Sequence, residues 1–395
     1  MTTLTATSMK VLLLNNVPSP YFSPLFEQLG HTPDWQLTVC YTTNWNPTVG
    51  WKNNELIDQS THRIVILDQI YPNTSKYLAS SLSATIALKQ FLGNEKPHYV
   101  ICYGYTLMPQ MLLLCWAILT KTNYALIGDA NYFFDNPGGL RKVIKDYWLR
   151  FITKRAAALI TIGTASKLFW EKYGASSSQI FESHLVVDNN FFSETSKSKS
   201  DEAADLRTRL GFNNKVVFLF VGRLIKRKNV DLIIQATHLL NSDNFSVVIA
   251  GSGDKTETLK RLAADKPNIF FAGNVTPNEL PVLYGMADVL VLPADQEPWG
   301  LVVNEAMACG LAIIAYQFCG AAVDLVDSEN GVKLNSFSAE ELASAMELLA
   351  TDQLLLRTMQ KNSFAKIQAW SIENAAEGII RAVKNTYHQP DKENS

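Results

Sequence analysis

Short apolar runs alternate with segments of helical periodicity along most of this chain. Val11–Leu14, Tyr99–Cys102 and Val216–Val221 each have the length of one buried strand, and each is followed by a predicted helix. Such alternation is typical of a parallel, doubly wound sheet, because parallel strands are joined by crossover helices. Sheets of this kind bind ligands at the carboxyl ends of their strands. We therefore predict an α/β fold whose functional residues lie in the loops that follow the strands.

Length and composition favour two globular domains. The chain has 395 residues, more than one domain usually contains, with 47% apolar and 18% charged residues. The stretch Ser193–Asp201 contains no apolar residue, and we predict that it is the linker between the domains. Ser371 is a predicted N-cap for a last helix that runs through Lys384.

The net charge and the pattern of cysteines limit the possible partners and the cellular compartment of this protein. A formal net charge of −2 gives no general attraction to nucleic acid. The five cysteines are scattered and lack the spacing of metal ligands, which favours a reduced, cytoplasmic setting. The first apolar run, Val11–Leu14, is too short for a signal sequence, and Leu107–Leu119 is too short to span a bilayer. We therefore expect a cytoplasmic protein with no nucleic-acid partner.

A predicted buried strand, Val289–Pro293, leads into a loop with Glu297 and Gly300 and then into a helix from Leu301. The first N–H groups of such a helix point at the end of a parallel strand, where an anion is stabilised. Glu305 lies inside this helix, eight residues after Glu297. The two carboxylates could contact opposite ends of one polar ligand. Alternatively, they are a surface and a helix-face glutamate, and spacing alone does not distinguish the two interpretations.

The segment after the strand Val216–Val221 is strongly basic. Arg223, Lys226, Arg227 and Lys228 follow Gly222 within seven residues, before the next predicted helix. Four cations in one turn repel one another unless water or an anion neutralises them. Arg223 could bind a diphosphate through its planar guanidinium and Lys228 through its mobile ammonium. The alternative is a solvated basic turn.

These two segments together resemble family 4 of the GT-B-fold glycosyltransferases, which transfer sugars from nucleotide sugars with retention of anomeric configuration. Other segments in the same order are also similar to that family, namely Val247–Gly253, Ile269–Val275 and Ala287–Val289. The resemblance runs from about residue 216 to residue 334 and is weak before it. It implies two Rossmann-like doubly wound domains facing a central cleft. It assigns residues 1–192 to an acceptor-side domain, 193–370 to a donor-binding domain, and 371–395 to a helix packing back on the first domain.

The resemblance also implies roles for individual residues. Glu297 would contact the hydroxyls of the donor sugar, and Glu305 those of the ribose. Arg223 and Lys228, with the helix N-terminus, would stabilise the leaving diphosphate. We find no Asp-x-Asp pair before a predicted strand end, so we expect no metal and no other cofactor. The remaining expected donor contacts are backbone groups of Gly222, Asn274, Val275, Gly300, Leu301, Val302 and Gly320.

The first domain departs from the family pattern at two loops. Relatives often have a glycine pair after the first strand, where this chain has Asn15–Phe22. Relatives also often place a histidine after a central strand, and none of the six histidines occupies that position. Asp129, which follows the predicted strand Tyr124–Ile127, could orient the acceptor or donor sugar instead. The alternative is that Asp129 caps a turn or helix.

The segment Arg141–Arg155 combines apolar residues at helical spacing with several cations. A basic amphipathic helix of this kind can lie on an anionic membrane, which would suit a lipid-linked acceptor and a peripheral location at the inner face of a membrane. We favour the alternative, in which the apolar stripe lies in the core and the cations are solvated.

The sequence therefore predicts a retaining, metal-independent glycosyltransferase. Its donor would be a UDP- or GDP-sugar, and its acceptor a polysaccharide, a glycolipid or another glycoconjugate. Two alternatives remain: a GT-B sugar-nucleotide enzyme that does not transfer, such as an epimerase, and an inactive donor-binding subunit. The intact set of Glu297, Glu305, Arg223 and Lys228 is unexpected in an inactive relic.

Overall fold

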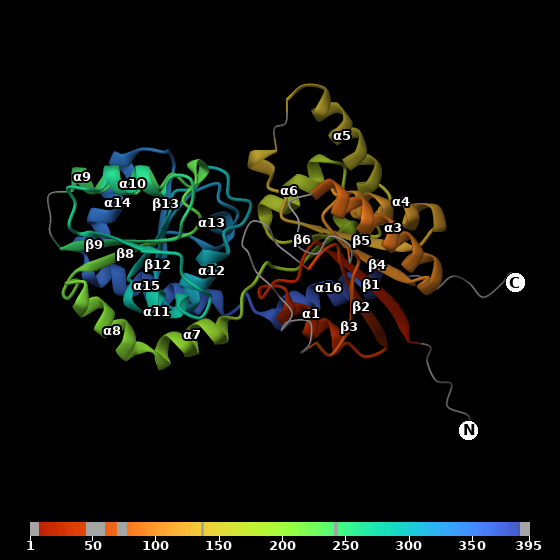
Figure 1. The fold of residues 1–395 in the computed structure, drawn as a ribbon, viewed down its shortest axis with the longest axis horizontal. Helices are drawn as coiled ribbons and strands as arrows, with labels where there is room; N and C mark the ends of the chain where they lie inside the picture. The colour runs from red at the N-terminus through yellow and green to blue at the C-terminus, as the bar shows by residue number, and fades with distance from the viewer. Residues whose placement is uncertain (1–7, 45–59, 69–76, 136–137, 241–243, 388–395) are drawn as a thin grey trace, which may run out of the picture. The chain divides into compact units, whose positions relative to one another are not determined.

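A computed structural model describes residues 8–44, 60–68, 77–135, 138–240 and 244–387. The chain divides into two compact units (Figure 1). Met1–His184 and Ile372–Ser395 form the first unit, and Leu185–Ser371 form the second. The second unit thus begins at Leu185, eight residues before the position that we predicted.

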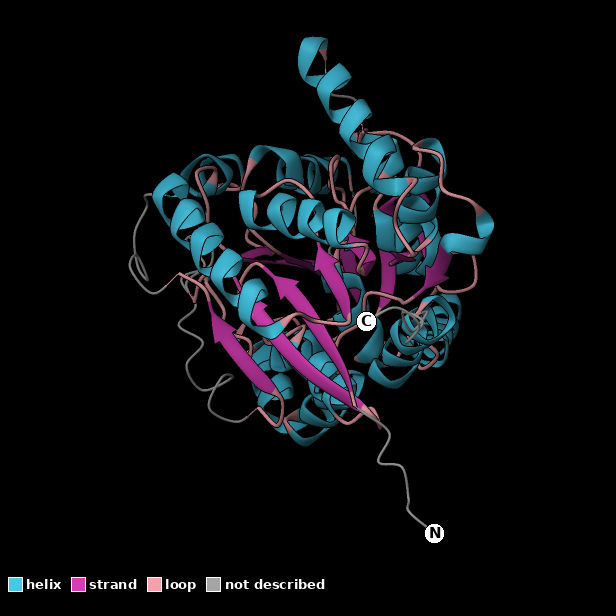
Figure 2. Ribbon diagram, turned by 90° about the vertical axis from the view of Figure 1, so that its right-hand side faces the viewer, coloured by secondary structure: helices cyan, strands magenta, loops and turns pink. Residues whose placement is uncertain are grey.

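The first unit contains a seven-stranded parallel sheet in the order β3-β2-β1-β4-β5-β6-β7. Helices cover both faces of these strands (Figure 2). The strands are β1 Met9–Asn15, β2 Trp35–Tyr41, β3 Arg63–Ile66, β4 Tyr99–Tyr103, β5 Asn123–Gly128, β6 Ala158–Thr161 and β7 Ile180–Glu182. The helices are α1 Ser23–Gly30, α3 Tyr77–Glu95, α4 Met108–Thr120, α5 Gly139–Thr153, α6 Thr164–Lys172 and α16 Ile372–Thr386, with short 3-10 turns η1 Tyr132–Phe134 and η2 Ser177–Gln179.

The last helix, α16, packs on the first unit through polar contacts at both of its ends. Ser183 Oγ donates to Ala375 O at 2.8 Å, and Asn123 Nδ2 donates to Thr386 O at 2.5 Å. Between these contacts, a Cβ atom on Gly378 would lie 2.1 Å from Glu182 O, so glycine is required for this close approach. The terminal segment therefore completes the first unit although it follows the whole of the second in sequence.

The second unit contains a six-stranded parallel sheet in the order β10-β9-β8-β11-β12-β13. The order reverses between β8 and β11, which is the switch point where doubly wound sheets bind ligands. The strands are β8 Val216–Val221, β9 Phe245–Ala250, β10 Ile269–Gly273, β11 Val289–Leu292, β12 Ala312–Tyr316 and β13 Gly331–Leu334. The helices are α7 Asn189–Ser198, α8 Ser200–Arg209, α9 Val230–Leu239, α10 Thr256–Leu262, α11 Leu280–Met286, α12 Leu301–Ala308, α13 Gly320–Leu325, α14 Ala339–Thr351 and α15 Gln353–Ile367, with the 3-10 turn η3 Lys226–Lys228.

The predicted linker Ser193–Asp201 is wrong, because these residues lie in α7 and α8 of the second unit. Asp188 caps α7 by accepting a hydrogen bond from Phe191 N at 2.9 Å. Phe192 is buried, with its ring 6.0 Å from that of Tyr284 in α11. Asn189 Nδ2 in the same helix also donates to Ile367 O at 3.0 Å and to Trp370 O at 3.1 Å, so a largely polar helix is held by a cap, a buried ring and side-chain hydrogen bonds.

The favoured interpretation of Arg141–Arg155 is also wrong for half of the helix. The segment is helical, as α5, but only Leu149, Ile152 and Thr153 are buried in it. Val143, Ile144 and Tyr147, which we expected in the core, are exposed. Among the described residues, no helix is long and apolar enough to cross a membrane.

Candidate active site

The switch point of the second sheet brings the two predicted motifs together. The Lys228 ammonium donates to Glu297 Oε2, although the two residues are 69 positions apart. Lys228 is 8% exposed and Glu297 is 9% exposed, so this ion pair is almost fully removed from water. The loops after β8 and β11 are also joined directly, because Asn229 Nδ2 donates to Pro293 O at 3.1 Å and Asp295 N donates to Arg227 O at 3.0 Å.

A second cation, Arg227, lies near the same carboxylate oxygen of Glu297. Its guanidinium donates to Gln296 O and lies 4.0 Å from Glu297 Oε2. Arg227 was not among the predicted site residues, and its place in the basic run 226–228 was the sequence signal for it. Oε2 of Glu297 therefore has both a buried ammonium and a partly exposed guanidinium as neighbours.

The loop that carries Glu297 is fixed by glycines on both sides. Gly300 precedes α12 with φ 99° and ψ 66°, a left-handed conformation that a side chain would strain. Gly320, at the start of α13, donates its N–H to Glu297 O at 3.2 Å, and a Cβ atom there would lie 2.0 Å from Pro298 O. The N-terminus of α12, with the half-buried Leu301 and Val302, follows this loop directly. We call the loop between β11 and α12 the glutamate loop. Its path close to α13 is possible because Gly320 has no side chain.

The predicted glycine turn after β9 packs against the turn after β8. Leu224 N donates to Ser252 O at 2.8 Å, and Gly222 N donates to Ala250 O at 3.0 Å. Cβ atoms on Gly251 and Gly253 would lie 1.9 Å from Gly222 O and 2.3 Å from Leu224 O, so both positions require glycine. Between these tied backbone segments, the Arg223 side chain is exposed to solvent.

The loop after β10 joins the same edge of the sheet. Asn274 Oδ1 accepts a hydrogen bond from Ser252 Oγ at 2.6 Å. Asn274 is exposed, and Val275 beside it is half-buried. The loops after β8, β9 and β10 therefore form one continuous hydrogen-bonded surface at the carboxyl end of the second sheet.

Glu305 has a different environment from Glu297. It is fully buried in α12, and its Oε2 accepts a hydrogen bond from the Tyr284 hydroxyl at 2.5 Å. Tyr284, in α11, is also fully buried, and sequence reasoning gave no indication of this partner. The carboxylate is thus anchored in the interior of the unit in this structure, and its expected contact with a ribose stays a prediction.

Asp129 lies in the first unit, directly after β5, and is exposed. The cap of the following turn, η1, is Asn131, whose Oδ1 accepts a hydrogen bond from Phe133 N at 2.9 Å. The capping role that we weighed for Asp129 is therefore filled in η1 by its neighbour. The proposed role of Asp129 toward a sugar stays a prediction.

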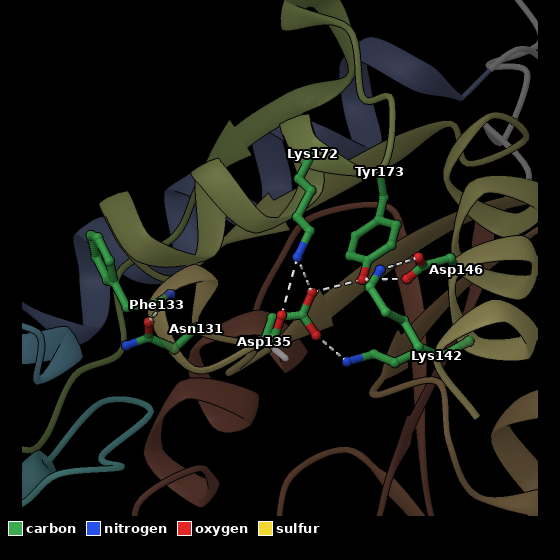
Figure 3. Close-up of polar contacts among 8 residues, drawn as sticks. Asn131, Phe133, Asp135, Lys142, Asp146, Lys172 and Tyr173 are labelled. Atoms are coloured by element: carbon green, nitrogen blue, oxygen red, sulfur yellow. Dashed lines mark hydrogen bonds and ion pairs between the residues drawn. The ribbon is translucent and has the colours of Figure 1, made fainter. Parts of the chain in front are cut away.

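The loop that begins at Asp129 is held by a cluster of charged groups around Asp135 (Figure 3). The Asp135 side chain is buried and accepts hydrogen bonds from Lys145, from Lys172 at 2.7 Å and from Tyr173 at 2.6 Å. Burial alone would raise the pKa of Asp135, but these hydrogen bonds outweigh it and lower the pKa to about 2. The carboxylate therefore ties the η1 loop to α5 and α6.

This low pKa gives the first unit a predictable acid response. Asp135 has a pKa of about 2 in the folded chain against 3.8 for a free side chain, so its contribution to stability is complete above about pH 4 and is lost as the pH falls toward 2. We expect Asp135→Asn to lower stability at neutral pH and to flatten its decline between pH 5 and pH 2. Urea unfolding as a function of pH measures this, with the exposed Asp254→Asn as a control. An unchanged slope in Asp135→Asn would contradict the assignment.

Comparison with known proteins supports the assignment of the second unit. Residues 203–366 match the glycosyl transferases group 1 family. The chain is 30% identical over 164 residues to a GDP-mannose-dependent alpha-(1-6)-phosphatidylinositol monomannoside mannosyltransferase of Mycolicibacterium smegmatis, which is 38% of this chain and 43% of that one. It is 31% identical over 211 residues to a D-inositol 3-phosphate glycosyltransferase of Corynebacterium aurimucosum, half of this chain and 49% of that one. The matched region thus spans less than half the length of these two relatives.

Solved structures match over nearly the whole chain. HepE of Anabaena in complex with UDP and glucose superposes with a TM-score of 0.73 at 16% identity, covering 95% of this chain and all of that one. Sucrose-phosphate synthase of Thermosynechococcus elongatus superposes with a TM-score of 0.74 at 18% identity, covering 95% of this chain and 98% of that one. At this identity the likeness establishes the fold.

Two doubly wound parallel sheets, one with paired charges at its switch point, define the chain as a GT-B-fold protein. Residues 203–366 of the second unit match the glycosyl transferases group 1 family, in agreement with the resemblance that the motifs in this half of the chain carry.

Proposed function

We propose that this protein is a retaining glycosyltransferase that moves a sugar from a UDP- or GDP-sugar to a polysaccharide, glycolipid or other glycoconjugate in the cytoplasm. The observation that carries the proposal is the buried pair of Lys228 and Glu297 at the switch point of the second sheet. A nearly dry cation and carboxylate at the carboxyl ends of parallel strands are suited to a ligand with both anionic and hydroxyl groups.

In the proposed donor site, different residues bind the diphosphate and the sugar hydroxyls. Lys228, Arg223 and the N–H groups at the start of α12 stabilise the negative charge that develops on the leaving diphosphate. Glu297 accepts hydrogen bonds from the hydroxyls of the transferred sugar, and the ion pair with Lys228 holds its carboxylate in place before the donor arrives. Because cations of the chain supply the positive field, we propose that transfer requires no metal.

The proposed transfer with retention needs no separate base, because the leaving phosphate accepts the proton of the acceptor hydroxyl. The bond from the anomeric carbon to the diphosphate oxygen breaks with both electrons going to that oxygen. The acceptor hydroxyl attacks from the same face, and its proton passes to the leaving phosphate. Asp129 is proposed to orient one of the two sugars. The names of the relatives are consistent with a nucleotide-sugar donor, since one is GDP-mannose-dependent and one structure contains UDP and glucose.

Thermal unfolding with UDP, GDP and ADP and with their common sugar conjugates, all in the presence of EDTA, tests the donor site. A ligand at a hundred times its Kd adds about 2.7 kcal/mol, a rise of roughly 5–10 °C for a domain of this size. We expect one nucleotide to stabilise the protein without metal and Arg223→Ala to remove most of that shift. Lys226→Ala, which changes another exposed cation of the same turn, is the matched control and should keep it.

Two outcomes would overturn parts of this proposal. Stabilisation only by a metal-bound nucleotide would contradict the metal-independent site, and equal loss in both variants would mean that the turn acts through net charge alone. Donor turnover separates the alternatives once a nucleotide is known. Nucleotide release with a new glycosidic product supports transfer, release of an epimerised free sugar supports an epimerase, and binding with no turnover on any acceptor supports a donor-binding subunit.

A further inference from the structure

Helix α5 presents an apolar face to solvent. Four large apolar side chains at positions i, i+3, i+4 and i+7 lie on one side of its first two turns. They are Leu140, Val143, Ile144 and Tyr147, which are 74%, 63%, 63% and 76% exposed. Scattered exposed apolar residues are common, but a contiguous row on one helix face usually marks an interaction surface.

The same face becomes basic in the second half of the helix. Arg150 lies one turn beyond Tyr147, and Lys154 and Arg155 follow after a further turn, all three of them exposed. We call the exposed residues Leu140, Val143, Ile144, Tyr147, Arg150 and Lys154 the outer face of α5. Leu149, Ile152 and Thr153, on the opposite side, are buried against the unit. The helix is therefore amphipathic around its axis, and its outer face is apolar at one end and cationic at the other.

Contacts on the inner side prevent the helix from turning its apolar row into the core. Lys145 is bound to the buried Asp135, and Asp146 Oδ1 accepts a hydrogen bond from the Tyr173 hydroxyl at 3.0 Å. Trp148 Nε1 donates to Tyr105 O at 3.1 Å. Rotation of α5 about its axis would break all three contacts. The outward position of the apolar row is thus fixed by the chain and does not result from a loosely packed helix.

We propose that the outer face of α5 binds the surface of an anionic lipid bilayer. An apolar row continued by cations matches a bilayer interface, where apolar side chains enter the acyl boundary while cations meet anionic headgroups. The chain carries a net charge of −2, so the attraction must come from this local group of cations rather than from the protein as a whole. Tyr147 suits the boundary because its ring is apolar and its hydroxyl is polar.

The proposed contact is shallow and reversible. Four apolar side chains and a few cations are comparable with a single weak anchor, for which binding depends on both terms together. The Asp135 cluster holds α5 in its helical form, so no folding on the membrane is required. Binding should therefore depend steeply on salt and on anionic lipid content.

Co-sedimentation of the full chain with phosphatidylcholine vesicles, with and without phosphatidylglycerol, tests the proposal. We expect binding only to the anionic vesicles, and less of it at high salt. Ile144→Ser with Tyr147→Ser should weaken binding by at least about tenfold. Serine at these positions removes the free energy gained when two large apolar side chains move from water into the bilayer. Arg150→Gln with Lys154→Gln should weaken it roughly 25-fold, about fivefold for each cation.

Matched variants on α15 serve as controls. Leu354 is 79% exposed, and Leu354→Ser should leave vesicle binding unchanged, as should Arg357→Gln with Lys361→Gln. Light scattering of the same samples tests for a second copy on the outer face. A dimer that Ile144→Ser with Tyr147→Ser dissociates, together with no vesicle binding, would overturn the proposal in favour of self-association. Equal binding to neutral and anionic vesicles, or equal losses in the controls, would also overturn it.

Discussion

Replacement of Lys228 by methionine should both destabilise the second unit and strongly slow the proposed sugar transfer. Lys228 and Glu297 are 8% and 9% exposed, and removal of Lys228 leaves the almost buried Glu297 without its nearer counter-charge. Loss of one member of a buried ion pair typically costs about 3–5 kcal/mol. Loss of one group that stabilises developing charge typically lowers the rate by about 10²–10³-fold. Urea unfolding and donor turnover measure the two effects separately.

The double variant Lys228→Met with Glu297→Leu separates packing from chemistry. Two apolar side chains of similar volume leave no unpaired charge, so we expect the double variant to recover most of the stability that Lys228→Met loses. Its rate in the proposed transfer should stay as low as that of either single variant, because the contacts that we propose from both residues to the donor are lost. Arg227→Gln is the milder comparison, since this partly exposed guanidinium lies 4.0 Å from Glu297 and should contribute less than about 1 kcal/mol. Additive stability losses in the double variant would show that the pair is not coupled.

The elements that frame this pair could be predicted from the sequence. The apolar run Val216–Val221 coincides with β8, and Val289–Pro293 ends one residue beyond β11. The helix expected from Leu301 to Ala308 has the bounds of α12. These elements have strong local signals, because each apolar run is bordered by glycine, proline or charged residues. The switch-point rule then places the two following loops at one edge of the sheet.

The pairing of side chains across that edge could not be predicted. The contact between Lys228 and Glu297 depends on the register of β8 with β11, where Leu219 is opposite Leu290. A one-residue slip in that register would place different side chains at the strand ends. Sequence spacing likewise gave no indication that Tyr284 binds Glu305, because the two residues are 21 positions apart on different helices. Arg223 was a reasonable choice by composition, yet Arg227 is the guanidinium that lies beside Glu297.

Two errors at the level of helices have physical causes. A polar composition indicated a linker at Ser193–Asp201, but polar residues also form solvent-exposed helices. A cap, the buried ring of Phe192 and hydrogen bonds from Asn189 hold α7 in place. In α5, periodicity showed that two faces differ without showing which of them packs inward. The buried Asp135 decides this by binding Lys145, a partner that hydrophobic patterning does not count.

Gly320→Ala should unfold the glutamate loop more strongly than its single added methyl group suggests. A Cβ atom at this position would lie 2.0 Å from Pro298 O and 3.0 Å from Trp299 Cα, and both are backbone atoms that no side-chain rotation can move. The loop between β11 and α12 would have to shift, which also breaks the hydrogen bond from Gly320 N to Glu297 O. We expect a loss of about 3 kcal/mol or more, the upper range for overpacking, and loss of the nucleotide-induced thermal shift.

Gly93→Ala is the matched control for this substitution. Gly93 lies in α3 of the first unit, and a Cβ atom there would meet no other atom within 4 Å. Alanine should therefore stabilise that helix by about 0.5–1 kcal/mol through the lower entropy of its unfolded chain. Urea unfolding and nucleotide thermal shift of both variants distinguish a steric effect from a general effect of glycine replacement. If Gly320→Ala keeps its nucleotide response while losing stability, the glutamate loop tolerates displacement, and Glu297 is not positioned for the donor by its contact with α13.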